Sequence, residues 1–266
     1  MASSPESPLA RDTWDPDQYG RFRDERSRPF LDLLAMVRPR PGMRIVDLGC
    51  GTGELTRLAH EQLHAAETLG IDRSASMLQR AAAGAGGGLR FEQGDLAQAR
   101  GHWDLVLSNA AVHWLPDHEA LLPRLCALVA PGGQVAVQLP DNHDHPSHRL
   151  ARETGEEEPF RAALEGWRKE RHVLPPERYA ELLFEAGLGD IDVQLRVYPH
   201  LLDGPEAVVE WVKGTLLNDW KERLPTALWE AFLARYREKL LAALPARRPF
   251  LYTYRRILFH AVRKAG

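Results

Sequence analysis

Short apolar runs alternate with amphipathic segments along the first 140 residues of the chain. Runs rich in Val, Ile, Leu and Phe predict strands, whereas apolar residues that recur every three to four positions predict helices. Pro29 is expected in the first turn of its helix, and residues 131–133 (Pro-Gly-Gly) are expected to form a turn. Alternating strands and helices are typical of a doubly wound parallel sheet with right-handed crossovers. The predicted strands are 44–48, 68–72, 89–92, 103–108 and 134–139, and the predicted helices are 29–37, 54–65, 75–83 and 117–129.

The pattern changes after residue 140. Residues 141–172 are charged, rich in His and irregular before they turn helical. We expect an α/β fold: a Rossmann-like, doubly wound, mostly parallel seven-stranded sheet, its last strand antiparallel, with an added helical cap. Helices are predicted at 175–187, 205–217 and 226–244, and strands that return to the sheet at 190–198 and 252–262. The expected regions are an N-terminal lid at 1–28, the core at 29–140, the cap and substrate region at 141–250 and the last strand at 251–266.

A glycine-rich turn follows the first predicted strand. Asp47 ends the apolar run, and glycines follow at positions 49, 51 and 53. A dinucleotide fingerprint requires its third glycine at position 54, which is Glu. Strand, glycine turn and helix in this order form a nucleotide-type pocket, and the helix N-terminus favours a carboxylate. The Asp-x-Gly-x-Gly-x-Gly pattern resembles motif I of the class I S-adenosyl-L-methionine (SAM) methyltransferases, where Asp47 would hold the ammonium group of the methionine moiety.

Acidic and amide residues lie at the ends of three further predicted strands or shortly after them. Asp72 can accept hydrogen bonds from ribose hydroxyls, although it could equally serve a nicotinamide cofactor or cap the next helix. Asp95 can bind the adenine amino group while Leu96 packs on the ring, or Asp95 can be an ordinary turn residue. Asn109 and Ala110 follow the fourth strand, where their main-chain carbonyls could line the methionine side.

Composition narrows the class of protein. The chain has 266 residues, of which 44% are hydrophobic and 27% charged, and its net charge is −3. That balance gives no support for nucleic-acid binding, which favours a basic face. No apolar run reaches about 18 residues, so no membrane span is expected. Cys50 and Cys126 lie outside any metal-ligand spacing, so we expect no metal, and reduced thiols in a cytoplasmic protein.

Four stretches spread over the chain are similar to one family within this class, the trans-aconitate methyltransferases. They read Trp-Asp-Pro-Asp-Gln-Tyr at 14–19, Glu-Arg-Ser-Arg-Pro at 25–29, Trp-Leu-Pro-Asp-His at 114–118 and Gln-Leu-Pro-Asp-Asn at 138–142. The resemblance implies methyl transfer from SAM to one carboxylate of trans-aconitate, giving a monomethyl ester and S-adenosyl-L-homocysteine (SAH). It also implies cofactor binding by Gly49, Gly51, Gly53, Asp72, Asp95 and Ala110.

A carboxylate acceptor requires no general base, because its unperturbed pKa of about 4 leaves it ionised near neutral pH. We therefore predict no catalytic base, and positioning as the main task of the protein. Arg26 and Arg28 are expected to bind the carboxylates that are not methylated, and Tyr19 to close over the cofactor. His113 and Trp114 either face the substrate or are structural residues. Second candidates for binding the acid are Arg255 and Arg256.

Other functions stay open at this point. The chain could be a class I O- or N-methyltransferase of natural-product type with a different acceptor, or a SAM-binding module without activity. An NAD(P)-dependent oxidoreductase is a further alternative, although Glu54 and the lack of a Tyr-x-x-x-Lys pair argue against it. The expected partner is a small-molecule acid, with no nucleic acid and no membrane, and the expected assembly is a monomer or weak homodimer.

Overall fold

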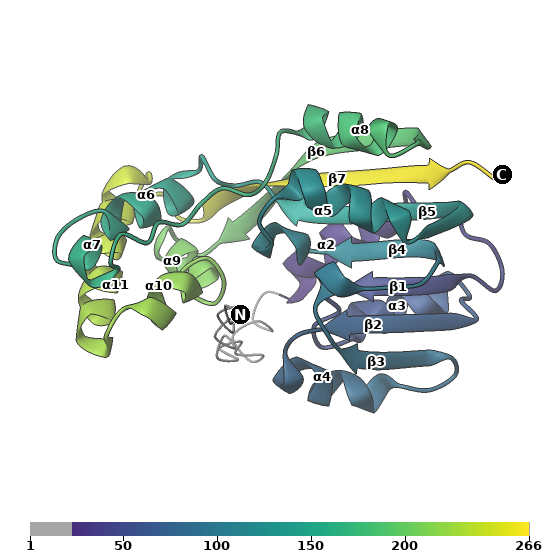
Figure 1. Cartoon of the computed structure of the whole chain (residues 1–266). Helices are drawn as coiled ribbons and strands as arrows, with labels where there is room; N and C mark the ends of the chain where they lie inside the picture. The colour runs from purple at the N-terminus through teal and green to yellow at the C-terminus, as the bar shows by residue number, and fades with distance from the viewer. Residues whose placement is uncertain (1–22, 266) are drawn as a thin grey trace, which may run out of the picture.

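The protein is built on one seven-stranded sheet with the strand order β3-β2-β1-β4-β5-β7-β6 (Figure 1). Neighbouring strands from β3 to β5 are parallel, and β7 is antiparallel to both β5 and β6. The expected mostly parallel sheet with an antiparallel last strand is therefore confirmed. The strands are β1 (Arg44–Leu48), β2 (Glu67–Asp72), β3 (Leu89–Gln93), β4 (Trp103–Asn109), β5 (Val129–Pro140), β6 (Leu188–Leu202) and β7 (Phe250–Arg263).

The computed structural model describes residues 23–265, with side chains from residue 27 onward. None of the helices in this range is both long and apolar enough to cross a membrane. The α-helices are α2 (Arg23–Leu34), α3 (Glu54–Gln62), α4 (Ala75–Ala81), α5 (His118–Ala127), α6 (Pro146–Gly155), α7 (Phe160–Ala163), α8 (Pro176–Glu185), α9 (Glu206–Lys213), α10 (Asn218–Arg223) and α11 (Thr226–Ala243). Short 3-10 turns are η1 (Ala82–Gly84), η2 (Leu96–Gln98) and η3 (Val112–Trp114).

Helices cover both faces of the sheet. On one face, Phe30 of α2 and Ala59 of α3 belong to a buried cluster with apolar residues of β1, β4, β5 and β7. On the other face, Leu125 of α5 and Tyr179 of α8 pack in a second cluster that includes Phe259 of β7. Full burial of one large apolar side chain stabilises a fold by about 1.5–3 kcal/mol. These two layers hold the parallel strands so that their carboxyl ends point toward the remaining helices (Figure 1).

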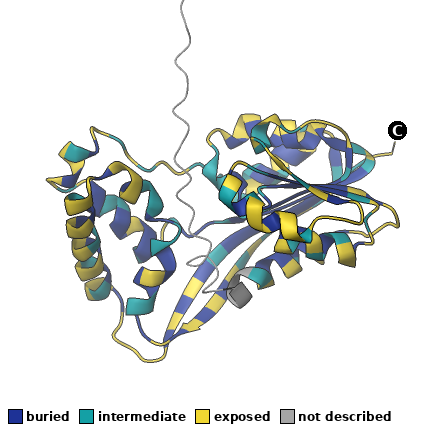
Figure 2. Cartoon of the chain, turned by 90° about the horizontal axis from the view of Figure 1, so that it is seen from below, coloured by how far each residue is buried: buried dark blue, intermediate teal, exposed yellow. Residues whose placement is uncertain are grey.

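The two longest strands, β6 and β7, form a ribbon that extends beyond the core (Figures 1 and 2). The ribbon is paired from Leu188 and Arg263 to Leu202 and Phe250. At its outer end Leu202, Phe250 and Tyr252 are buried in a third cluster with residues of α6, α7, α9, α10 and α11. At the outer end of the ribbon buried and exposed residues alternate, as expected where one face is covered (Figure 2). The predicted strands 190–198 and 252–262 are too short. The outer ends of β6 and β7 are buried against the helices of the cap, and the two strands stay paired up to Leu202 and Phe250.

Two local predictions are wrong. Residues 131–133 lie inside β5, and the register with β4 shifts between Trp103 and Leu105, so the glycines form an irregularity within the strand. A Cβ atom on Gly133 would lie 2.8 Å from the carbonyl oxygen of Ala130, which explains the requirement for glycine. Pro29 lies inside α2, not in its first turn, because the helix begins at Arg23.

Candidate active site

The glycine turn between β1 and α3 lies at the carboxyl edge of the sheet. Gly49, Gly51 and Gly53 have left-handed φ angles of 83°, 55° and 74°, which residues with side chains rarely adopt. A Cβ atom on Gly49 would lie 2.1 Å from Cβ of Ala111, and one on Gly53 would lie 2.6 Å from Cζ of Phe91. A Cβ atom on Gly51 would meet no atom within 4 Å. The middle of the turn therefore faces open space, where a ligand can approach the backbone closely.

Asp72 connects the end of β2 to the glycine turn. Its Oδ2 atom accepts a hydrogen bond of 2.8 Å from the N–H of Gly51, and its Oδ1 atom accepts one of 2.9 Å from the N–H of Ser74. The hydroxyl oxygen of Ser74 in turn caps α4 at Met77. Each carboxylate oxygen keeps a further acceptor position. Asp72 therefore fixes the turn and can still accept hydrogen bonds from ligand hydroxyls.

Asp47 is a buried carboxyl group at the end of β1, with 3% of the residue exposed. Its Oδ2 atom accepts a hydrogen bond of 2.6 Å from the hydroxyl of Thr56 in α3. Its Oδ1 atom is buried and has no hydrogen-bond partner among the described residues. Burial and the nearby charge of Asp72 raise the pKa of Asp47 to about 7, against the opposing effect of the Thr56 hydrogen bond. A buried oxygen without a donor fits a positively charged N–H group of a ligand.

The end of β4 supplies a second unpaired acceptor. The Oδ1 atom of Asn109 is buried and has no hydrogen-bond partner in the part of the chain that the structure describes. Ala110 has a left-handed φ of 52°, and its N–H donates a hydrogen bond of 2.9 Å to the carbonyl of Gln138. Asn109 lies one strand away from Asp47 in the sheet, so β1 and β4 present their acceptors at the same edge.

Asp95 and Leu96 follow β3. Asp95 is exposed, and its Oδ1 atom accepts a hydrogen bond of 2.9 Å from the N–H of Ala97, so it caps the short turn η2. Leu96 is half-buried beside the glycine turn, with its Cδ2 atom 3.7 Å from the position of a Cβ on Gly49. The geometry thus shows a capping role for Asp95, and its contact with adenine stays a prediction.

The turn η3 carries His113 and Trp114, whose ring centroids lie 4.6 Å apart. Burial, together with the positive charges of Lys169 and Arg256, lowers the pKa of His113 well below its ordinary value. The Nδ1 atom of His113 is buried and has no hydrogen-bond partner among residues 27–265. The ammonium of Lys169 lies 4.9 Å from the Trp114 ring centroid. A neutral imidazole therefore lies among several cationic side chains.

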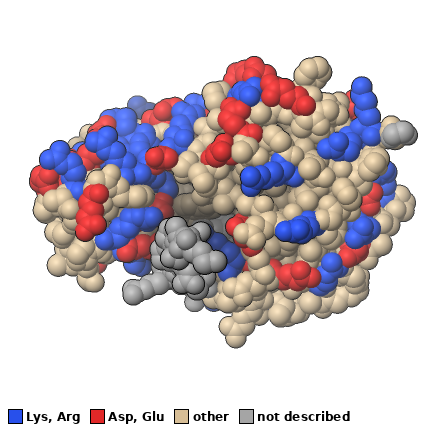
Figure 3. Space-filling model, viewed as in Figure 1, with Lys and Arg blue, Asp and Glu red and all other residues tan. Residues whose placement is uncertain are grey.

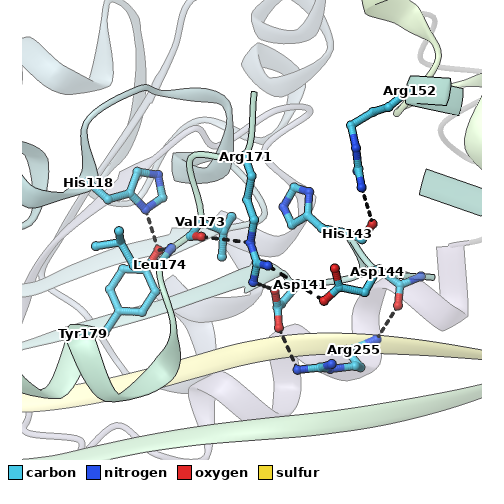
Figure 4. A network of polar contacts seen from close by, with 11 residues as sticks. His118, Asp141, His143, Asp144, Arg152, Arg171, Val173, Leu174, Tyr179 and Arg255 are labelled. Carbon is cyan, nitrogen blue, oxygen red and sulfur yellow. Dashed lines mark hydrogen bonds and ion pairs between the residues drawn. The ribbon is translucent and has the colours of Figure 1, made fainter. Parts of the chain in front are cut away.

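A charged network lies close to this turn, and Arg255 is its one member predicted from the sequence as a candidate site residue (Figure 4). Asp141 follows β5 and accepts hydrogen bonds of 3.0 Å from Arg171 and 3.1 Å from Arg255. Burial raises the pKa of Asp141, although both arginines oppose that shift. Arg152 donates a hydrogen bond of 3.0 Å to the carbonyl of His143. The position of Asp141 directly after a buried strand, at the edge where Asp47 ends the apolar run of β1, is the signal that could have found this network.

The predicted acid-binding residues are placed only in part. Arg28 is exposed on α2, and after burial and Arg256 its positive charge adds to the lowering of the pKa of His200 in β6. Of Arg26, only the backbone is described, and Tyr19 lies outside the described residues. The space-filling view shows a hollow between the core and the cap, with Lys and Arg side chains on the cap (Figure 3).

Both cysteines are free and buried. Cys50 lies in the glycine turn, where burial and the charges of Asp47 and Asp72 raise the pKa of its thiol. Burial raises the pKa of Cys126 to about 12. Both thiols stay protonated near neutral pH, so neither is an activated nucleophile.

A sheet of this order, with a glycine turn after β1 and acidic residues ending β1 and β2, defines the class I methyltransferase fold. The family model described as a methyltransferase domain matches residues 19–193. A trans-aconitate 2-methyltransferase of Deinococcus radiodurans is 47% identical over 94% of this chain and 98% of its own. A second one, of Streptomyces avermitilis, is 43% identical over 97% of this chain and 100% of its own. The chain belongs to the trans-aconitate 2-methyltransferase family.

Solved structures agree with the fold. The YcgJ protein of Bacillus subtilis is 15% identical, with a TM-score of 0.59 over 90% of this chain and all of its own. A putative methyltransferase of Bacillus halodurans is 14% identical, with a TM-score of 0.56 over 89% of this chain and 99% of its own. At these identities the likeness shows the architecture alone.

Proposed function

We propose that the protein transfers the methyl group of SAM to one carboxylate of trans-aconitate, giving a monomethyl ester and SAH. The near-complete alignment with trans-aconitate 2-methyltransferases supports this assignment. The structural observation that carries it is the buried Oδ1 atom of Asp47, which has no donor among the described residues and lies at the end of the strand that leads into the open side of the Gly51 turn. A ligand that offers an ammonium group next to a carboxylate, as the methionine moiety does, satisfies both features.

The cofactor contacts follow from this placement. Asp47 accepts from the ammonium, and the glycine turn with the N-terminus of α3 holds the carboxylate. Asp72 accepts from the ribose hydroxyls, and Asp95 with Leu96 holds the adenine. Asn109 and Ala110 line the methionine side, and Tyr19 closes over the cofactor. The glycines of the turn are Gly49, Gly51 and Gly53.

The reaction is an in-line displacement that needs no proton transfer. SAM supplies a methyl group on a positively charged sulfur. A carboxylate oxygen of the acid forms the new bond to the methyl carbon while the carbon–sulfur bond breaks and its electron pair stays on sulfur. The acid is already ionised, so the protein orients the two reactants. Burial lowers the pKa of His113, which makes its imidazole a weak base, and transfer to an ionised carboxylate requires none.

The acceptor is held by cationic and aromatic side chains. Arg26 and Arg28 bind the carboxylates that are not methylated, each through a bidentate fork. His113 and Trp114 line the reacting end. The cations of the Asp141 network, Arg171 and Arg255, add positive potential at the same mouth.

Methyl transfer from labelled SAM tests the proposal. Trans-aconitate is compared with cis-aconitate, citrate, isocitrate and a panel of phenols and amines, and the product is identified by mass spectrometry. We expect a monomethyl ester of trans-aconitate as the main product. Preferred turnover of a phenol or an amine would contradict the carboxylate acceptor, and calorimetric binding of NADH in place of SAH would contradict the cofactor.

We also propose that the protein acts in the cytoplasm as a monomer or weak homodimer. Two free, buried cysteines support a reducing compartment. Cell fractionation and light scattering at several protein concentrations test the two statements separately.

A further inference from the structure

Gln138 is a buried amide that makes no side-chain hydrogen bond to any residue the structure describes. It lies near the carboxyl end of β5 and is 0% exposed. Neither its Nε2 atom nor its Oε1 atom has a hydrogen-bond partner in the described part of the chain. Both polar atoms of one side chain are thus buried and unsatisfied, which is rare in folded proteins and requires an explanation.

Gln134, on the same strand, shows the ordinary arrangement. Its Oε1 atom accepts a hydrogen bond of 2.8 Å from the N–H of Arg38 and one of 2.9 Å from Nε2 of His260. Its Nε2 atom donates one of 2.8 Å to the carbonyl of Arg38. Gln134 is therefore a structural amide. Gln138 has no such hydrogen bonds within residues 27–265, and an apolar side chain of similar size at its position would cost the fold less free energy.

The sheet register places Gln138 between the cofactor side and the cap. Asn109 of β4 lies level with Gln138, which lies level with Leu258 of β7. Side chains two residues apart on a strand share a face, so Arg256 follows on the same face as Leu258. Asn109, Gln138 and Arg256 thus belong to three successive strands that lead away from the glycine turn, which lies beyond β4 on β1.

Positive charge lies on the far side of Gln138. Arg256 is 6% exposed, and its guanidinium carbon lies 4.8 Å from the ring centroid of Tyr254. Arg196 of β6 lies directly opposite Arg256 in the register and pairs with Asp32 at 3.1 Å. The Gln138 amide is therefore flanked by an unpaired acceptor on Asn109 and by a buried cation on β7.

We propose that Gln138 binds the acceptor acid and sets its position against the methyl donor. Its amide N–H₂ donates to a carboxylate of a small di- or tricarboxylic acid, and the guanidinium of Arg256 balances the charge of that acid. This inference rests on the proposed methyl transfer to a carboxylate and adds a residue that decides which acceptor is accommodated.

The test compares Gln138→Met with Gln134→Met and with the wild-type chain. Each protein is measured for thermal unfolding, for SAH binding by calorimetry and for the steady-state kinetics of trans-aconitate methylation. We expect Gln138→Met to keep or raise the melting temperature, because no hydrogen bond is lost. Its KM for the acid rises about tenfold or more, while its Kd for SAH stays within about twofold. Gln138→Glu raises the KM further, because a carboxylate repels the acid.

The control separates a structural from a substrate-binding role. Gln134→Met lowers the melting temperature, and its folded fraction keeps the wild-type KM. A clear drop in melting temperature for Gln138→Met, or an unchanged KM in an active enzyme, would overturn the role of Gln138 and leave the methyl transfer intact. A wild-type chain that binds SAH but methylates no acid would overturn the proposed function itself, and with it the acid as the ligand of Gln138.

Discussion

The hydroxyl of Tyr179 in α8 is hydrogen-bonded to His118 in α5, 61 residues earlier in the chain (Figure 4). The Nε2 atom of His118 lies 3.1 Å from the carbonyl oxygen of Val112, to which only an N–H can donate. Nδ1 is therefore the acceptor, and the Tyr179 hydroxyl donates to it while accepting a hydrogen bond of 3.2 Å from the N–H of Leu174. These bonds connect η3, which carries His113, to the segment that carries Arg171.

Replacing Tyr179 with Phe breaks both bonds and leaves a buried acceptor and donor unpaired. We expect the free energy of unfolding to fall by about 1–3 kcal/mol, measured by urea denaturation. Tyr198→Phe is a comparison variant, since its hydroxyl donates a part-buried hydrogen bond to the Asp32 carboxylate and also contacts Arg196, and its loss is expected to cost about 1.5–3 kcal/mol. An unchanged free energy of unfolding for Tyr179→Phe would show that the connection to His118 contributes little.

Substitutions at two glycines of the turn distinguish an effect on folding from an effect on ligand binding. Gly51→Ala places a Cβ in open space at a left-handed φ, so we expect a loss of stability of about 1–2 kcal/mol and a large loss of SAH affinity. Gly53→Ala forces a Cβ against Phe91 and Ala81 and is expected to destabilise the fold more strongly. Thermal unfolding and calorimetry measure the two effects. Normal SAH binding by Gly51→Ala would mean that the ligand does not lie against the turn.

Because the pKa of Asp47 is raised, we expect cofactor binding to be coupled to the release of a proton. At pH 6 the empty protein holds a proton on this carboxyl group, whose pKa is about 7, and an arriving ammonium group displaces it. We expect SAH binding at pH 6 to release close to one proton, and binding at pH 9 to release none. Calorimetry in buffers of different ionisation enthalpy measures this number. Asp47→Asn should release no proton at either pH.

The raised pKa of Asp47 also determines how the stability of the fold changes with pH. The folded chain holds the Asp47 proton up to about pH 7, whereas the unfolded chain loses it near 3.8. The contribution of Asp47 to stability is thus complete below pH 3.8 and falls as the pH rises through 7. Asp47→Asn should therefore flatten the pH dependence of the melting temperature between pH 4 and 7.

His113→Ala tests whether a base is used. Its imidazole is neutral across the working range, because burial and neighbouring cations lower its pKa. For a carboxylate acceptor we expect less than about a tenfold loss in kcat/KM and no change in the shape of the pH–rate profile from pH 6 to 9. A loss in kcat/KM of about a hundredfold or more would indicate that His113 acts as a base, as an alcohol or phenol acceptor requires.

Arg28→Ala tests the predicted contact with the acid. Loss of one bidentate guanidinium–carboxylate contact should raise the KM for trans-aconitate by about tenfold or more and leave the Kd for SAH little changed. Arg40→Ala is a matched control, because Arg40 pairs with Asp104 on the exposed surface. Equal kinetics for Arg28→Ala and wild type would remove Arg28 from the site.

The local elements were predictable from the sequence. The predicted strand 44–48 coincides with β1, and the glycine turn that follows it has the expected left-handed angles. An apolar β-branched run and glycine spacing are properties of neighbouring residues, so they are legible without the fold. The parallel order of the core follows in the same way, since each strand, helix and turn is encoded within about 30 consecutive residues.

Residues far apart in the chain were paired only by the tertiary structure. The β6–β7 ribbon is longer than predicted because the cap buries its outer end around Tyr252. Asp141 and Arg255, which form an ion pair, lie 114 residues apart in the sequence. That the amide of Gln138 has no partner among the described residues depends on which side chains the fold packs around it. Sequence periodicity thus determined which segments form the sheet and where its glycine turn lies. Register and packing decided which side chains meet at its edge, because those contacts depend on the energy of the whole fold.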